Sequence, residues 1–363
     1  MKRLVATTVV ACTALWAMHG AAATPKPARR AVAGIEAASY ASNDGVRSFA
    51  AAVAARRGLD EAWVLRALAQ ARRVPAVQRL IMPPPAGTAK NWAAYRERFV
   101  EPQRIAAGLA WWRAHKAWLD DAEARWGVPQ EIVVAIIGVE TYYGRITGGF
   151  RIIDALATLS FDFPPGRSDR SGFFRSELEE FLVWAEREGL DPAGVKGSFA
   201  GAIGLPQFMP GSINRYAIDF DGDGHIDLRG HPVDRVSRMG TSPDVVGSVA
   251  NFLAQHGWEQ GLPTHYAVKV PVDSRDRAAL LVPDIVPSFS AAQFAERGAV
   301  LDEAGRAHEG PLALVELQNG GAAPSYVAGT KNFYVVTRYN WSSYYALAVI
   351  DLAQALRRGE SAR

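Results

Sequence analysis

The chain has 363 residues, of which 49% are hydrophobic and 21% charged. This composition is that of an ordinary soluble globular protein, and it excludes long disorder over most of the length. The formal net charge is only +3 at pH 7 and no long Lys/Arg run occurs, so the sequence predicts no nucleic-acid partner.

Residues 1–23 have the layout of a secretory signal peptide, with a basic start, an apolar stretch and three small residues at the end. The apolar stretch is shorter than the ~20 residues that a membrane-spanning helix needs. We therefore expect an exported, periplasmic protein. Residues 9–12 (VVAC) also fit a lipobox, and the alternative is an outer-membrane lipoprotein anchored through Cys12. Because Cys12 is the only cysteine, no disulfide is expected in the mature protein.

The next part of the chain predicts a leader followed by a helical segment. Residues 24–45 begin with a Pro- and Arg-rich stretch typical of a disordered leader. Residues 46–90 form an N-terminal helical segment, in which residues 46–80 carry apolar side chains at helical spacing and predict two short helices separated at Gly58. The sequence MPPPAGT at 82–88 fits only an extended connector.

The remainder divides into a helical core, a short β-containing part and a final return. Residues 91–261 predict a series of helices, interrupted at 197–228 by a Gly-, Pro- and Asp-rich loop. Residues 262–332 alternate like strands, and residues 333–363 end in a long amphipathic helix. The expected fold class is mainly α (α+β), a helical body with a small inserted β-containing subdomain.

One predicted helix carries an acid among apolar residues, in the sequence VPQEIVVAIIGVETYYGR at 128–145. Helical spacing places Glu140 on one face with three aliphatic side chains, those of Val133, Ile136 and Ile137. We expect Gly144 to end the helix, so Glu140 lies in its last turn. Lost hydration and the negative end of the helix dipole both raise a carboxyl pKa, which favours a general acid.

Two considerations bear on whether Glu140 is catalytic or structural. The alternative is that Glu140 extends to solvent or pairs with Arg145 or Arg151, as most helical glutamates do. A glycosidase commonly uses two carboxylates about 5 to 9 Å apart. None of the downstream acids has a comparably apolar setting: Asp154, Asp162 and Asp169. The residues thus offer one good acid and no convincing partner for it.

The sequence DFDGDGHIDL begins a loop at 219–230 that matches an EF-hand pattern. Positions one, three, five, seven and nine are Asp219, Asp221, Asp223, His225 and Asp227. The twelfth position is Gly230, which has no carboxylate, so Asp234 or Asp244 would have to fold back. We predict a structural Ca²⁺ site, and the alternative is a solvated Asp/Gly turn.

Several segments in order carry a resemblance: EIVVAIIGVETYYGR, RIIDALATLSFDFP, KGSFAGAIGLPQFMPGSINRYAIDFDGDGHIDL, VVGSVANFLAQHGW and NFYVVTRYNWSSYYALAV. Together they resemble the B-family lytic murein transglycosylases, envelope enzymes with an SLT-type, lysozyme-like catalytic domain. The match extends over residues 92–356. It implies cleavage of the MurNAc–GlcNAc β-1,4 bond of peptidoglycan without water, by one Glu that acts as acid and then as base, giving a 1,6-anhydroMurNAc end. The missing second carboxylate agrees with this.

The resemblance also implies roles for individual residues. Glu140 would be the acid/base, and Ser198 would hydrogen-bond to it, although Ser198 equally suits a turn. The other substrate-binding residues implied are Gln207, Tyr339, Asn340, Tyr345, Tyr95 and Arg170. Core packing is an equal alternative for Tyr95 and Tyr345. The stretch PPGRSDRSGFF departs from the family pattern, which leaves the choice between Arg167 and Arg170 open.

The expected partners are peptidoglycan glycan strands and, in addition, other cell-wall enzymes, with a monomeric protein and no organic cofactor. Two other functions stay open at this point. The first is a hydrolytic, lysozyme-type muramidase that uses Glu140 with an unrecognised Asp. The second is a catalytically weak peptidoglycan-binding scaffold.

Overall fold

The computed structural model describes residues 40, 43–83, 89–229, 231–232, 240–241, 243–270 and 276–362. The expected signal peptide, Cys12 and two positions considered for the acidic loop, Gly230 and Asp234, lie outside these ranges. In the described ranges, no helix combines the length and apolar character needed to cross a membrane.

Three helices, rather than the two expected, form the start of the described chain: α1 (Asp44–Arg57), α2 (Glu61–Ala69) and α3 (Pro75–Leu80). Gly58 ends α1 in the left-handed conformation, with φ 69°, as the sequence predicted. The third helix begins at Pro75, where the missing N–H removes no helical hydrogen bond. The sequence pattern did not distinguish α3 as a separate helix because it has only six residues.

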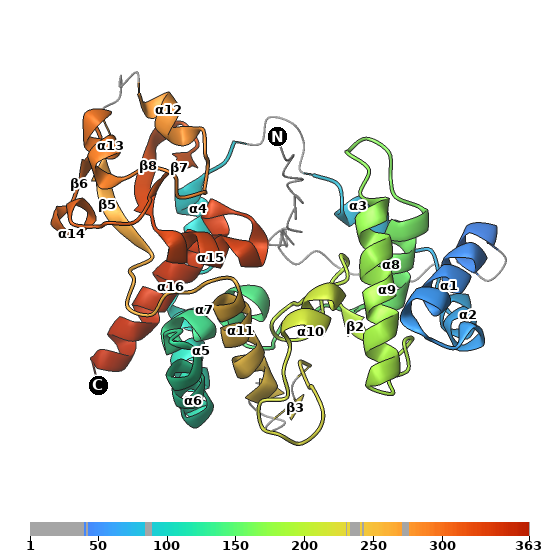
Figure 1. The fold of residues 1–363 in the computed structure, drawn as a ribbon. Helices are drawn as coiled ribbons and strands as arrows, with labels where there is room; N and C mark the ends of the chain where they lie inside the picture. Colours follow the sequence, from blue (N-terminus) through green and yellow to red (C-terminus); the bar gives the residue numbers. More distant parts are fainter. Residues whose placement is uncertain are drawn as a thin grey trace, which may run out of the picture.

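These helices lie against a second pair, α8 (Ile152–Phe161) and α9 (Ser171–Arg187) (Figure 1). Arg56 and Arg57 of α1 both form ion pairs with Glu179 of α9, with N–O distances of 2.6 Å. The short helix α10 (Pro210–Tyr216) packs on α9 inside the region expected to be loop. The short strands β1 (Phe150–Arg151) and β2 (Lys196–Gly197) pair antiparallel next to α8.

The centre of the molecule is a helical group around α7 (Gln130–Thr141), which is almost completely buried. The helices packed around it, directly or through one another, are α4 (Trp92–Glu97), α5 (Pro102–Ala114), α6 (Lys116–Trp126), α11 (Pro243–Gln255), α15 (Lys331–Asn340) and α16 (Ser343–Ser361). Figure 1 shows α16, the last helix of the chain, running back beside α7 and α5. Helices from both ends of the sequence therefore enclose the middle one.

A four-stranded antiparallel sheet with strand order β6-β5-β8-β7 lies within 262–332. Its strands and accompanying helices are β5 (His265–Lys269), α12 (Arg277–Leu281), α13 (Ala291–Glu296), β6 (Val300–Leu301), α14 (Glu303–Arg306), β7 (Ala313–Asn319) and β8 (Ala322–Gly329). This part has its own buried cluster, which includes Tyr266, Leu280 and Phe294. It forms a separate corner of the molecule in Figure 1. A further short pair, β3 (His231–Pro232) and β4 (Gly240–Thr241), follows the acidic loop.

Candidate active site

The helix that carries Glu140 ends earlier than the sequence predicted. It ends at Thr141, and Tyr142 and Tyr143 both adopt positive φ, at 52° and 58°. The expectation that Gly144 ends the helix was wrong because Tyr143 turns back under α7 and fills the space beside two helical glycines. A Cβ on Gly138 would lie 2.5 Å from the Tyr143 hydroxyl oxygen, and one on Gly108 of α5 2.2 Å from it. This packing outweighs the local preference for glycine.

Glu140 is the last but one residue of α7, and its side chain keeps partial exposure while the helix around it is buried. Burial raises the pKa of the Glu140 carboxyl from 4.5 to about 7, and an interaction with the Tyr345 hydroxyl lowers it in part. Neither arginine considered for it pairs with it. Arg145 stacks on Tyr142, and Arg151 forms an ion pair with Asp154. The carboxyl therefore keeps its proton to a higher pH than an exposed glutamate does.

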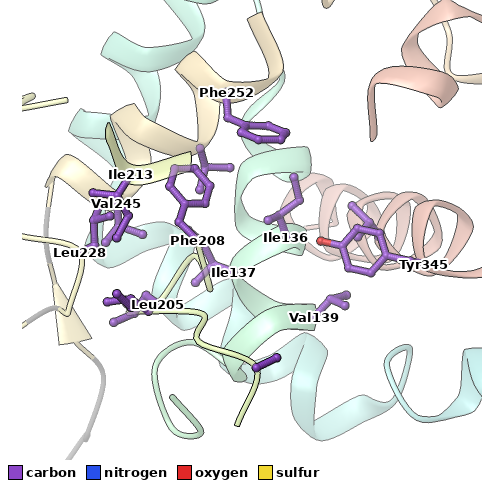
Figure 2. Packing of buried hydrophobic residues seen from close by; sticks show 14 of the residues in the cluster. Ile136, Ile137, Val139, Leu205, Phe208, Ile213, Leu228, Val245, Phe252 and Tyr345 are labelled. Atoms are coloured by element: carbon purple, nitrogen blue, oxygen red, sulfur yellow. The ribbon is translucent and has the colours of Figure 1, made fainter. Parts of the chain in front are cut away.

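Three tyrosines distant in sequence surround this carboxyl: Tyr95 of α4, Tyr339 of α15 and Tyr345 of α16. The negative charge of Glu140, added to burial, raises the pKa of each phenol, so each lies within its electrostatic range. Tyr339 and Tyr345 are stacked, with ring centroids 6.2 Å apart. The Tyr345 hydroxyl is buried, and within the described chain it makes no well-formed hydrogen bond. Figure 2 shows Tyr345 pointing from α16 toward α7.

The loop from 197 to 208 brings Gln207 next to the end of α7. Backbone hydrogen bonds between Ile203 and Phe208, of 2.8 and 3.1 Å, close it into a tight turn. The Gln207 backbone has φ 50°, and its Nε2 donates to the carbonyls of Thr147 and Gly204 at 3.2 and 2.8 Å. Both amide protons are thus used by the protein, and the side-chain oxygen is the acceptor that remains.

Ser198 lies at the start of the same loop and is buried. Its hydroxyl oxygen accepts a 2.9 Å hydrogen bond from the Ala202 N–H, which favours a turn role. Among the hydrogen bonds that the described residues form, none joins Ser198 to Glu140. Asn340 ends α15 beside Tyr339, with a partly exposed side chain.

Arg170 belongs to another part of the molecule. It precedes α9, and its guanidinium lies 4.7 Å from the ring centroid of Phe173. Arg167 is hydrogen-bonded to the Ile81 carbonyl. The structure therefore places both arginines with the α8–α9 pair.

The three acids considered as second carboxylates are each bound elsewhere. Asp154 accepts a 2.9 Å hydrogen bond from the Arg72 N–H, and Asp162 accepts one from the Tyr40 hydroxyl. Asp169 binds the N–H of Ser171. No carboxylate in the described chain contributes to the pKa of Glu140. Glu140 is thus the one acid of this site, within the residues described.

In the acidic loop, the carboxylates converge differently from the EF-hand expectation. Oxygens of Asp219, Asp221 and Asp244 lie within 4.8 Å of one another. Asp223 instead accepts a hydrogen bond from the His225 N–H, and the Asp227 N–H donates to Asp244 Oδ2, both at 2.8 Å. Asp244, one of the two residues suggested for the missing twelfth position, is the acid that folds back.

The fit of these residues to a hard cation rests on their charge and burial. Asp244 is buried, and burial together with the charges of Asp221 and Asp219 raises the pKa of its carboxyl. A divalent cation bound by these oxygens would offset most of this negative charge. The donor set, three carboxylates, is of the kind that Ca²⁺ prefers.

Sequence reasoning missed three residues that shape this site. Thr141 and Arg104 both bind the last turn of α7: the Thr141 hydroxyl contacts the Leu205 carbonyl at 3.0 Å, and Arg104 Nη1 donates to the Gly138 carbonyl at 2.5 Å. The guanidinium groups of Arg104 and Arg145 lie 4.4 and 4.7 Å from the ring centroid of Tyr142. Of these three residues, only Thr141 could have been suspected from the sequence, because it directly follows Glu140.

Comparisons with known proteins agree with this geometry. Residues 41–354 match the family model described as the transglycosylase SLT domain. The chain is 38% identical over 325 residues to membrane-bound lytic murein transglycosylase B of Escherichia coli (strain K12), covering 87% of this chain and 84% of that protein. The structure is similar to the soluble lytic transglycosylase SltB1 of Pseudomonas aeruginosa, with a TM-score of 0.76, 37% identity, and coverage of 87% and 99%.

It is also similar to the Escherichia coli lytic transglycosylase SLT35 in complex with calcium, with a TM-score of 0.75, 36% identity, and coverage of 89% and 95%. These likenesses extend over most of both chains, so they concern the whole described fold and not one motif. The mainly helical, lysozyme-like fold expected from the sequence is confirmed. The chain belongs to the SLT-domain transglycosylase family and is a lytic murein transglycosylase.

Proposed function

We propose that Glu140 alone supplies both the acid and the base for cleavage of the MurNAc–GlcNAc β-1,4 bond of peptidoglycan. The observation that carries this is the setting of its carboxyl, buried enough for a pKa of about 7 and without a second carboxylate near it. A carboxyl with this pKa is well populated in both protonation states at neutral pH. One residue can therefore give a proton and later take one.

The reaction then balances as follows. The Glu140 carboxyl protonates the glycosidic oxygen as the C1–O bond breaks, and the leaving GlcNAc keeps that proton. The carboxylate next removes the proton of the MurNAc C6 hydroxyl, whose oxygen bonds to C1 and closes the 1,6-anhydro ring. Glu140 is protonated again at the end, and no water is consumed.

The residues around Glu140 have complementary roles in this proposal. The Gln207 side-chain oxygen accepts a hydrogen bond from the sugar or its N-acetyl group, since its amide protons are already used. Tyr95, Tyr339, Asn340 and Tyr345 line the groove for the glycan strand. Ser198 supports the turn that presents Gln207. Arg170, at the α8–α9 pair, contacts a more distant part of the strand or its peptide.

The proposal includes a structural Ca²⁺ held by Asp219, Asp221 and Asp244, with the other acidic-loop positions, Asp223, His225 and Asp227, completing the oxygen ligands through side chains, backbone or water. Bound Ca²⁺ would offset two of the three negative charges and fix the loop. The convergence of these acids supports it, as does the calcium complex of SLT35. The protein acts in the periplasm, where peptidoglycan and free Ca²⁺ are both present.

Mass spectrometry of digested sacculi tests the reaction. The wild-type protein should release 1,6-anhydromuropeptides, and Glu140→Gln should release none above background. Muropeptides with reducing ends would show the hydrolytic alternative, and binding without release by the wild type would show the scaffold. Full activity of Glu140→Gln would remove the basis of the proposal.

A further inference from the structure

The side chain next to the proposed acid is a buried hydroxyl. Thr141 is 1% exposed and ends α7. Its Oγ1 lies 3.0 Å from the Leu205 carbonyl oxygen and 3.3 Å from that of Ile137, and it accepts a 3.1 Å hydrogen bond from the Gly144 N–H. A hydroxyl has one proton, so the shorter contact to Leu205 is its main donated bond. Thr141 thus joins the helix end, the turn after it and the loop 197–208.

The three residues from Leu205 to Gln207 are each held by a different partner. Leu205 is bound by Thr141 and, through its N–H, by the Leu228 carbonyl at 2.8 Å. The Pro206 carbonyl accepts a 2.6 Å hydrogen bond from the Tyr339 hydroxyl. Figure 2 shows Leu205 and Leu228 within the same buried cluster as Ile136 and Ile137 of α7. Of these hydrogen bonds, only the one from Thr141 connects residues 205–207 to α7, the helix that carries Glu140.

We propose that Thr141 is a positioning residue that fixes Glu140 relative to Gln207. The inference rests on the proposed function of these two residues. It follows because α7 ends one residue after Glu140 without a glycine, so the direction of the carboxyl depends on how the last turn is closed. A displacement of about 1 Å between reacting groups can cost about 100-fold in rate.

The same path continues to the acidic loop. Leu228, which binds Leu205, directly follows Asp227, whose N–H donates to Asp244 Oδ2. Asp244 of the candidate cation site is therefore connected to Thr141 through one backbone hydrogen bond and two that each use a side-chain oxygen. Gly204 permits this approach, because a Cβ there would lie 2.1 Å from the Leu228 carbonyl oxygen. A cation bound to Asp244 would therefore also stabilise residues 205–207, to which Thr141 is hydrogen-bonded.

The test compares Thr141→Val, which keeps the shape and loses the hydroxyl, with Thr141→Ser, which keeps the hydroxyl. On soluble glycan strands, we expect Thr141→Val to lower kcat about 10- to 100-fold with KM changed less than about threefold. We also expect its alkaline pH limb to move, because the setting of Glu140 changes. Thr141→Ser should restore kcat to within about threefold of the wild type.

Thermal unfolding separates this role from a purely structural one. A lower Tm of Thr141→Val with kcat and pH profile unchanged would overturn the inference, as would an equal loss in Thr141→Ser. If Thr141→Val does not fold, Thr141→Ala serves in its place. Failure of the proposed function is distinguishable, because Glu140→Gln would then stay active. If Glu140→Gln is inactive and Thr141→Val is fully active, only the positioning role of Thr141 is contradicted.

Discussion

The Tyr345 hydroxyl and the Glu140 carboxyl face each other between α16 and α7. The hydroxyl is buried and lacks a well-formed hydrogen bond in the described chain, yet its interaction with Glu140 lowers the carboxyl's pKa against the larger effect of burial. A buried polar group without a partner costs free energy unless something else gains from it. Here it adjusts the protonation of the proposed acid.

Tyr345→Phe should therefore raise the pKa of Glu140, because it removes the interaction that lowers it. Cleavage requires the protonated acid first, so the alkaline limb of kcat/KM against pH should move to higher pH. Tyr344→Phe is the matched control. Its hydroxyl binds the Gln318 backbone, and its pKa is not affected by Glu140. An alkaline limb that stays in place in Tyr345→Phe would contradict the assigned interaction.

Glu140→Gln should make the stability of the protein less dependent on pH. The folded pKa of Glu140, about 7, exceeds its ordinary value of 4.5, so the native state holds the extra proton between these values. The free energy of unfolding of the wild type should thus fall as pH rises from about 4.5 to about 7, and stay low above. Full burial would give about 3 kcal/mol, and partial exposure reduces this to about 1–2 kcal/mol.

Denaturant unfolding of both proteins at pH 5 and pH 8 measures the difference. Glu140→Gln should gain on the wild type at pH 8 and not at pH 5. A difference independent of pH would show that the carboxyl titrates normally. It would then be a poor acid at neutral pH, whatever its position.

Gly138→Ala should destabilise the protein although alanine is the better helix former. The new Cβ would lie 2.5 Å from the Tyr143 hydroxyl oxygen and 2.7 Å from its Cζ. Overpacking of this kind costs about 1–3 kcal/mol, more than the ~1 kcal/mol gained in helix propensity. Gly172→Ala in α9 is the control, since no atom lies within 4 Å of its Cβ. Thermal unfolding should show opposite signs for the two, and a stabilised Gly138→Ala would refute this packing.

Ca²⁺ should raise the Tm by a few degrees, because a ligand at 100 times its Kd stabilises by about 2.7 kcal/mol. Asp221→Asn should lose most of this gain. Asp221 belongs to the converging acids and lies exposed, so the substitution leaves the buried Asp244 in place. Asp121→Asn, an exposed acid on α6, should keep the whole response. Equal responses in both variants would place the ion elsewhere.

Much of the site was visible in the sequence because its signals are local. The apolar period of 3.6 residues placed Glu140 on a buried face, which already predicted its raised pKa. The spacing of acids after Asp219 marked the loop as a cation-site candidate, and the order of motifs carried the family resemblance. The EF-hand pattern left open which acid folds back onto the loop, and the structure brings Asp244 to Asp219 and Asp221, while Asp223 accepts a hydrogen bond from the His225 N–H.

What only the tertiary structure decided is which distant residues meet. Local preference favours glycine at a helix end, but Tyr143 packs against Gly108 and Gly138 and ends α7 at Thr141 instead. Tyr345 approaches Glu140 because α16 returns beside α7. Such meetings depend on shape and burial summed over the whole core, which no window of sequence contains. The sequence determined the acid and its apolar helix, and the packing determined which side chains the Glu140 carboxyl meets.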